Sequence, residues 1–230
     1  MAELIVALDV NRGPDALRLL DRLPQARWVK VGSRLMTREG GSLLQRLTER
    51  GLLVFLDLKW HDIPHTVAGA VETAQEIGVR MATIHALGGA EMLAAAAQAA
   101  HSLSLVAVTV LTSHNAESYG AALGRSALSV DEEVARLTRA AFAAGLAGVV
   151  CSAHEVRAAR SALGPEGLIV VPGIRRTGDP SGDQRRIATP RQAVSDGATH
   201  LVVGRPLLAA RDPAGVFRQM KEEVEACGQP

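Results

Sequence analysis

The chain has 230 residues, of which 47% are hydrophobic and 21% are charged, and its formal net charge at pH 7 is +1. A chain of this length can bury a large core, and we expect one domain over residues 1–230. A net charge near zero gives no electrostatic reason to expect nucleic acid or an anionic membrane as a partner, and no apolar run approaches the roughly 20 residues of a membrane span.

The N-terminal segment and the cysteines indicate a protein of the cytoplasm. The first ten residues, MAELIVALDV, contain Glu3 and Asp9 and no basic leader, so they predict a first strand and not a signal peptide. Cys151 and Cys227 lie far apart and form neither a metal-binding spacing nor a disulfide framework, which favours a reducing compartment. A buried apolar role is expected for Cys151.

Strands and helices are predicted to alternate along the chain. Short apolar runs predict eight strands, at Leu4–Leu8, Arg27–Val31, Leu52–Lys59, Met81–His85, Leu103–Leu111, Val149–Cys151, Leu168–Val171 and His200–Val203. Helices are expected after the turn at Asn11–Pro14 through about Leu23, at Leu35–Arg50, Thr66–Ile77, Ala90–His101, Val130–Ala144, His154–Leu163 and Pro190–Asp196, and from Pro206 to the tail. The polar segment Pro172–Thr189 is predicted to be a long loop.

Eight short apolar strands that alternate with helices are typical of a parallel sheet in an α/β protein. Because the eight units follow one another without a linker, they favour a single closed (β/α)8 TIM barrel. The alternative is an open doubly wound sheet. That fold usually carries a glycine-rich fingerprint after its first strand, and the segment from Asp9 to Gly13 does not match it.

The segment Phe55–Val67, FLDLKWHDIPHTV, is the strongest chemical signal in the sequence. Asp57 and Lys59 are two residues apart, so in a strand both side chains point to the same face, and Asp62 follows three residues later. Opposite charges at the end of a buried strand are costly unless they pair or take part in chemistry. This stretch therefore predicts a catalytic site.

Polar residues recur at the ends of the other predicted strands, and in a (β/α)8 barrel these ends surround the active site. Each of them also has a structural interpretation. His85 fits a core histidine, Thr112 and Asp9 fit helix or turn caps, and Lys30 fits a structural ion pair with Asp57. Their joint occurrence favours a site, because a structural interpretation must explain each separately. The strand-end residues are Asp9, Lys30, Asp57, Lys59, His85, Thr112, Arg175, Gly204 and Arg205.

The last two units predict a phosphate site. Gly204 and Arg205 stand at the start of a predicted helix, where backbone N–H groups and a cation suit an anion. Phosphate sites of these barrels commonly lie after strands seven and eight. The long loop fits a lid that closes on phosphate, and the alternative is a solvated basic loop. It supplies the polar residues Arg175, Arg176, Gln184, Arg185 and Arg186, with glycines at Gly173, Gly178 and Gly182.

Lysine is rare in this chain, with only Lys30, Lys59 and Lys221 among 25 basic residues. Lysine, unlike arginine, can release a proton near neutral pH when its surroundings lower its pKa, and two of the three stand at predicted strand ends. No metal site is predicted, because the histidines outside the strand ends show no ligand spacing. These are His61, His65, His101, His114, His154 and His200.

The chain resembles the orotidine 5'-monophosphate decarboxylase family, in its short bacterial type, over essentially its whole length. The motif D-x-K-x-x-D-I-P appears at Asp57–Pro64; alone it is moderately specific, because a wider group of phosphosugar barrels shares it. Six motifs in order make the resemblance highly specific. The other five are ALD at Ala7–Asp9, VKVG at Val29–Gly32, VLTS at Val110–Ser113, VPGIR at Val171–Arg175 and VVGRP at Val202–Pro206.

This resemblance implies decarboxylation of orotidine 5'-monophosphate in UMP biosynthesis, by a cytoplasmic homodimer that uses no cofactor or metal. It implies that Lys59 is the proton donor, that Asp57 lies beside the substrate carboxylate, and that Lys30 and Asp62 complete an array of alternating charge. Asp62 and Thr66 would reach in from the partner subunit. The substrate-binding residues that it implies are Asp9, Lys30, Asp57, Ile63, Thr66, His85, Thr112, Pro172, Arg175, Gln184, Gly204 and Arg205.

Two positions depart from the family pattern: Trp60 stands where Phe is usual and His65 where Asn is usual. Neither carries a catalytic role in the family, so we expect altered packing or dimer contacts. Two rival functions remain. One is a metal-dependent decarboxylase or hexulose phosphate synthase of the same barrel group, which would place an acidic metal ligand where this chain has Lys30. The other is a non-catalytic barrel that binds a phosphate ligand.

Overall fold

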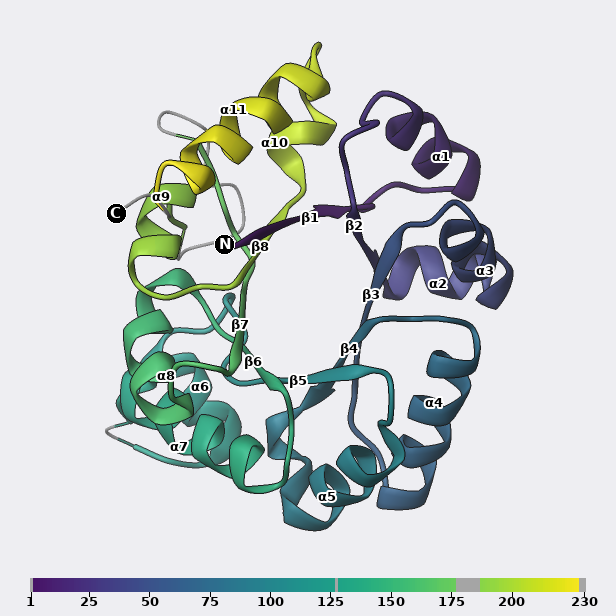
Figure 1. The fold of residues 1–230 in the computed structure, drawn as a ribbon. Coiled ribbons are helices and arrows are strands. Elements are labelled where there is room, and N and C mark those ends of the chain that lie inside the picture. Colours follow the sequence, from purple (N-terminus) through teal and green to yellow (C-terminus); the bar gives the residue numbers. More distant parts are fainter. Residues whose placement is uncertain (1, 127, 177–186, 228–230) are drawn as a thin grey trace.

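The structure is a computed structural model that describes residues 2–126, 128–176 and 187–227. Eight parallel strands pair in chain order and close into a barrel, in which β8 also pairs with β1. Figure 1 shows this ring of strands with the helices arranged around its outside. The predicted (β/α)8 barrel is therefore confirmed. The strands are β1 (Glu3–Ala7), β2 (Trp28–Gly32), β3 (Leu53–Trp60), β4 (Met81–His85), β5 (Ser104–Val108), β6 (Gly148–Val150), β7 (Leu168–Val171) and β8 (His200–Val203).

The helices follow the strands in the alternating order that the sequence predicts. Those between β1 and β5 are α1 (Gly13–Asp21), α2 (Ser33–Glu39), α3 (Gly41–Glu49), α4 (Pro64–Glu76), the 3-10 helix η1 (Ala86–Gly88) and α5 (Gly89–Ala99). After β5 come α6 (Ala116–Leu123), α7 (Val130–Ala143), the 3-10 helix η2 (Ala153–Glu155), α8 (Val156–Leu163), α9 (Pro190–Ser195), α10 (Arg205–Leu208) and α11 (Pro213–Glu225).

The strands bury both of their faces, which explains why they read as continuous apolar runs. One face fills the inside of the barrel, and the other packs under the helices. In β1, Ile5 and Ala7 belong to the inner cluster, whereas Leu4 and Val6 belong to the outer core. The inner cluster consists of Ile5, Ala7, Phe55, Met81, Val106, Val170 and Val202.

Every second side chain of a strand points to the same face, so the inner face continues along each strand to the carboxyl end of the barrel. Two residues beyond Ala7, Phe55 and Met81, the inward positions are Asp9, Asp57 and Thr83. Polar side chains thus replace apolar ones at the last inward layer. This change positions the candidate site at the carboxyl ends of the strands, where active sites of such barrels lie.

The single helix predicted over Leu35–Arg50 is wrong, because the chain forms two helices, α2 and α3. They are separated at Gly40, which has φ 65° and ψ −162°. Residues other than glycine rarely adopt this conformation, and it breaks the helix although the apolar spacing continues through it.

Two other predicted elements differ from the structure, and one helix was not predicted. β5 ends at Val108 and not at Leu111. The unpredicted helix α6 follows it, and Asn115 caps α6 by accepting a hydrogen bond from Ser118 N at 2.8 Å. The C-terminal helix is two helices, α10 and α11, and Asp212 caps the second through Gly215 N at 3.0 Å.

Candidate active site

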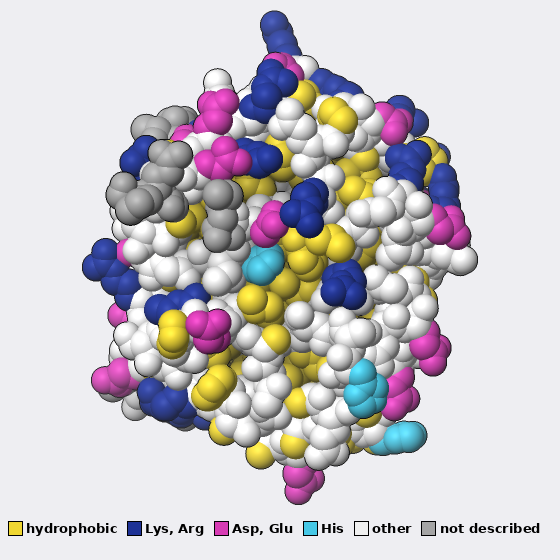
Figure 2. All heavy atoms as spheres, in the orientation of Figure 1, with side chains coloured by type: hydrophobic (Ala, Val, Ile, Leu, Met, Phe, Trp, Pro, Cys, Tyr) yellow, Lys and Arg dark blue, Asp and Glu magenta, His cyan; other side chains and the backbone are white. Residues whose placement is uncertain are grey.

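A cavity of about 220 Å³ opens at the carboxyl ends of the strands. Apolar residues of the inner cluster, among them Ala7 and Phe55, form part of its wall. Figure 2 shows hydrophobic side chains around the centre of one face of the molecule, with basic, acidic and histidine side chains beside them. The structure brings many of the predicted site residues to this cavity: Asp9, Lys30, Asp57, Lys59, Thr112, Pro172, Arg175, Gly204 and Arg205.

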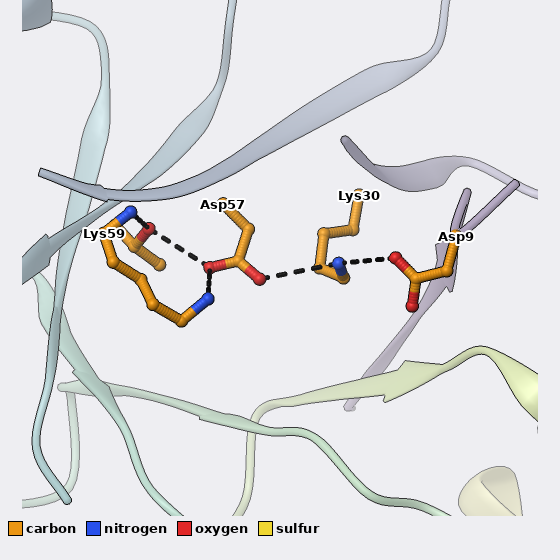
Figure 3. A network of polar contacts seen from close by, with 5 residues as sticks. Asp9, Lys30, Asp57 and Lys59 are labelled. Carbon is orange, nitrogen blue, oxygen red and sulfur yellow. Dashed lines mark hydrogen bonds and ion pairs between the residues drawn. The ribbon is translucent and has the colours of Figure 1, made fainter. Parts of the chain in front are cut away.

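Four charged side chains form a row of alternating sign along the cavity (Figure 3). Lys30 Nζ lies 3.1 Å from Asp9 Oδ1 and 3.5 Å from Asp57 Oδ2. The other oxygen of Asp57, Oδ1, lies 2.7 Å from Lys59 Nζ. The structure therefore contains the predicted pairing of Asp57 with both lysines.

The row becomes more exposed from Lys30 toward Lys59. The side chain of Lys30 is 11% exposed and that of Asp57 16%, whereas that of Lys59 is 38% exposed. Burial favours the neutral form of Asp57, but the charges of Lys30 and Lys59 and hydrogen bonds from Lys59 and Thr83 outweigh it. They hold the pKa of this carboxyl below its usual value, so Asp57 is a carboxylate at neutral pH.

An irregularity in β3 places Lys59. Leu56 pairs with Ala82 and Trp60 pairs with Ile84, so β3 has the three residues from Asp57 to Lys59 where β4 has Thr83 alone. Lys59 has φ 54°, the one positive φ among the described non-glycine residues. Such a backbone is strained for a residue with a side chain and is often found at functional sites.

Sequence reasoning missed Thr83, which is fully buried. Its Oγ1 donates to Asp57 Oδ1 at 3.2 Å and accepts from Lys59 N at 2.8 Å. The alternation of inward and outward side chains along β4 could have indicated it. Met81 points into the barrel, and Thr83, two residues further on, therefore points to the same side.

The predicted phosphate side of the cavity is formed by Gly204 and Arg205, at the start of α10, and by Arg175 after β7. A Cβ at Gly204 would lie 3.3 Å from Ala7 Cβ and 3.4 Å from Asp9 Oδ2, so a side chain there would crowd the wall. Arg175 is only 4% exposed, and its backbone N–H donates to the backbone carbonyl of Ala188 at 3.0 Å. This bond and the bridge of Ile174 to Ala188 join the two ends of the long loop.

The central part of that loop lies outside the described residues. It includes Gln184, Arg185 and Arg186 and the glycines Gly178 and Gly182, so the predicted lid and the predicted contact of Gln184 with phosphate stay predictions.

Three predicted site residues, the catalytic candidate Asp62 and the substrate-binding candidates Ile63 and Thr66, do not line the cavity of their own chain. Asp62, Ile63 and Thr66 are exposed at the end of β3 and the start of α4, and Ile63 is 66% exposed. Asp62 Oδ1 accepts a hydrogen bond from Ile63 N at 2.7 Å. Within a single chain, the row therefore has four members, and Asp62 is not one of them.

His85 is also outside the cavity wall, although it ends β4. Its Nδ1 accepts from Leu87 N at 3.3 Å, and its ring stacks on that of His61 with centroids 5.3 Å apart. Burial lowers the pKa of His85, and the neighbouring His61 and Lys59 lower it further. The geometry assigns His85 a capping and packing role, and its predicted contact with substrate stays a prediction.

The described part of the chain contains no group of three or more His, Cys, Asp or Glu side chains placed to bind a metal ion. Cys151 is buried, with 1% of its surface exposed, as the sequence predicted, and it also contributes to the cavity wall. The helices that could be searched, in residues 2–126, 128–176 and 187–227, are too short or too polar to cross a membrane.

Comparison with known proteins places this geometry in context. The model of the Orotidine 5'-phosphate decarboxylase / HUMPS family matches residues 2–220. The orotidine 5'-phosphate decarboxylase of Moorella thermoacetica is 45% identical over 97% of this chain and 92% of its own. That of Halorhodospira halophila is 48% identical over 98% of this chain and 97% of its own. A crystal structure of orotidine 5'-phosphate decarboxylase from Lactobacillus acidophilus matches with a TM-score of 0.86 and 33% identity, over 97% of this chain and 99% of that one.

Proposed function

The chain belongs to the orotidine 5'-phosphate decarboxylase / HUMPS family, and we propose that it converts orotidine 5'-monophosphate to uridine 5'-monophosphate and CO2 without a cofactor. This carboxy-lyase reaction belongs to pyrimidine biosynthesis. The observation that carries the proposal is the row of alternating charge on the cavity wall, in which Asp57 lies between Lys30 and Lys59. The cytoplasm stays the expected location.

The chemistry requires a cation at the carbon that loses CO2. When the bond from C6 of the pyrimidine to the carboxylate breaks, its electron pair stays on C6, where no adjacent π-system delocalises it. Lys59 stabilises this carbanion as an ammonium and then transfers a proton to C6, which yields uridylate and a neutral amine that solvent reprotonates. Asp57, ionised and 2.7 Å from Lys59 Nζ, holds the end of the lysine side chain in place through an ion pair.

Magnitudes decide which effect dominates. Asp57 lies where it repels a substrate carboxylate, and two unit charges about 4 Å apart at an effective dielectric of 20 interact by roughly 4 kcal/mol. Very proficient enzymes lower their barriers by about 20 kcal/mol. Repulsion therefore supplies a minor part, and preorganised stabilisation of the carbanion by Lys59 supplies much more.

The roles of the cavity residues toward the two ends of the substrate follow the family resemblance, and their place in the cavity wall supports them. Asp9 and Lys30, at one end of the row, suit the ribose hydroxyls, whereas Thr112 and Pro172 suit the base. Arg205 offers a cation to the phosphate, and Arg175 and Gly204 line the same cavity. A contact of Gln184 with the phosphate stays an expectation, because this residue lies outside the described residues. Binding energy from this remote group is then available to assemble the site for the reaction.

The enzyme is proposed to act as a homodimer whose subunits share their active sites. Asp62 and Thr66 are exposed in the single chain and lie apart from its own cavity, which supports a role in the cavity of a partner. Ile63, between them in sequence, is one of two large hydrophobic side chains that are strongly exposed in the described part of the chain. In the proposed dimer this side chain is buried against the second subunit, which accounts for its exposure in the single chain.

A metal-dependent reaction of the same barrel group is disfavoured by the residue at the end of β2. Lys30 Nζ lies within 3.5 Å of carboxylate oxygens of both Asp9 and Asp57, so its positive charge occupies the place where a divalent cation would need an acidic ligand. Activity that EDTA abolishes and added metal restores would contradict this reasoning.

The proposal is tested by following orotidylate spectrophotometrically with the purified protein and with two lysine variants. Lys59→Ala should lose roughly 10⁴-fold or more in kcat, because it removes both the proton donor and the cation at the carbanion. It should still bind uridylate. Lys221→Ala is the matched control, because Lys221 lies on α11 and pairs only with Glu225 in the described structure. Near-normal turnover by Lys59→Ala would sink the assignment.

A further inference from the structure

The buried hydroxyl of Thr83 joins the two charged residues at the centre of the proposed chemistry. It donates to Asp57 Oδ1 at 3.2 Å and accepts from the backbone N–H of Lys59 at 2.8 Å. A hydroxyl has one proton to donate and two lone pairs, so one group can make both bonds at once. Thr83 is 0% exposed, and water therefore cannot replace either bond in the native structure.

The local backbone explains why this hydroxyl is needed. Between the pairs Leu56 with Ala82 and Trp60 with Ile84, β3 has two more residues than β4, which disrupts the regular ladder. A buried backbone N–H without a partner is costly, and the N–H of Lys59 finds its partner in a side chain of β4. The strained φ of 54° at Lys59 is thereby held from the neighbouring strand.

We propose that Thr83 is a positioning residue for the decarboxylation, which fixes the Asp57 carboxylate and the Lys59 backbone relative to each other through one hydroxyl. The inference rests on the proposed function for its consequence in turnover. Its geometry can be tested without substrate, because both bonds join groups of the chain itself. Thr83 acts through Asp57 and Lys59 and needs no contact with the substrate, since it does not line the cavity.

The hydroxyl also affects the charge of Asp57. The carboxylate is flanked by Lys30 on β2, Lys59 on β3 and Thr83 on β4, with Asp9 beyond Lys30 and His85 near Lys59. Its hydrogen bond from Thr83 is among the interactions that lower the pKa of Asp57. Loss of this bond should raise that pKa, so that the carboxyl takes up a proton at a higher pH.

The test compares Thr83→Val, which keeps the shape and removes the hydroxyl, with Thr83→Ser, which keeps the hydroxyl. Because Thr83→Val removes a hydrogen bond to a charged group, we expect kcat to fall roughly 10- to 100-fold. KM should change much less. The acid limb of the pH profile should move to higher pH in Thr83→Val. Thr83→Ser should restore both the rate and the limb, and Thr83→Ala replaces Thr83→Val if the latter does not fold.

Thr109→Val is the matched control for the loss of a buried threonine hydroxyl. Thr109 is also 0% exposed, and its Oγ1 donates to the backbone carbonyl of Val150 at 2.9 Å and not to a residue of the charged row. It should lower the melting temperature without moving the acid limb. If Thr83→Val and Thr109→Val lower stability alike and neither changes kcat nor the limb, Thr83 is merely structural and the inference is overturned.

A second measurement separates this inference from the proposed function. The pKa of Asp57 can be followed by NMR of the 13C-labelled carboxyl in the parent protein and in Thr83→Val, without any substrate. A higher pKa in the variant supports the positioning role even if the parent protein fails to turn over orotidylate. The opposite result is that the parent protein turns over orotidylate, while Thr83→Val changes neither the pKa of Asp57 nor kcat. That result would support the proposed function and overturn the inference about Thr83.

Discussion

Sharing of active sites between two subunits can be tested by combining two damaged chains in one dimer. One chain carries Lys59→Ala and the other Asp62→Ala, each with its own affinity tag, and dimers that contain both are isolated. In the proposed arrangement, Lys59 of one chain works with Asp62 of its partner. The mixed dimer then has one site with both residues intact and one site with neither.

The size of the effect follows from the charges and the symmetry. A carboxylate about 4 Å from the Lys59 ammonium contributes roughly 4 kcal/mol at an effective dielectric of 20, so the Asp62→Ala homodimer should lose roughly 10³-fold in kcat. The Lys59→Ala homodimer should lose more. The mixed dimer should recover about half of the parent kcat per dimer, because one of its two symmetry-related sites is intact.

The measurement is the initial rate of orotidylate loss at saturating substrate. A dimer of one parent chain and one Lys59→Ala chain is the control, since it should show half of the parent rate whether or not the sites are shared. If the mixed dimer is no more active than the two homodimers, Asp62 serves its own chain. If the Asp62→Ala homodimer keeps the parent rate, Asp62 has no part in the reaction.

Two further predictions concern the stability of the barrel. Burial lowers the pKa of His200 to about 4, whereas a histidine in the unfolded chain titrates near 6.5. As the pH falls from 6.5 to 4, only the unfolded chain takes up this proton, so the free energy of unfolding decreases by about 3 kcal/mol. Urea unfolding of His200→Gln should therefore depend less on pH than that of the parent protein, and an equal pH dependence of the two would contradict this. Gly148→Ala should destabilise the protein by several kcal/mol in thermal unfolding, because its Cβ would lie 2.0 Å from the carbonyl oxygen of Leu168 on β7. Gly69→Ala, whose Cβ would have no neighbour within 4 Å, should cost nothing, and equal loss in both variants would refute the steric reasoning.

The barrel and most of the charged row could be predicted from the sequence for the same physical reason. Parallel strands covered on both faces appear as unbroken apolar runs, so Asp9, Lys30 and Asp57 stand out where such a run ends. Barrel closure brings these ends together, although the residues are far apart in the chain. The sequence therefore indicates both the architecture and the residues at its rim.

Other features depend on geometry that a linear pattern does not contain. The helix break at Gly40 and the extra residues of β3 before Trp60 leave the apolar spacing nearly unchanged. Thr83 reads as one more residue of a buried strand, and its two partners are known only once β4 lies beside the irregular part of β3. The proposed role of Asp62 depends on a second chain, which neither the linear pattern nor the single barrel contains.

The alternating row limits how this site can change during evolution. Lys30 and Lys59 flank Asp57, so replacement of Asp57 alone leaves two adjacent cations without the anion between them. Replacement of Lys30 alone leaves Asp9 and Asp57 without their common partner. Each single step costs stability as well as activity, because an uncompensated charge in a partly buried site is unfavourable. Descendants with a new reaction are therefore more accessible through paired replacements, and the row is expected to be inherited or lost as a unit.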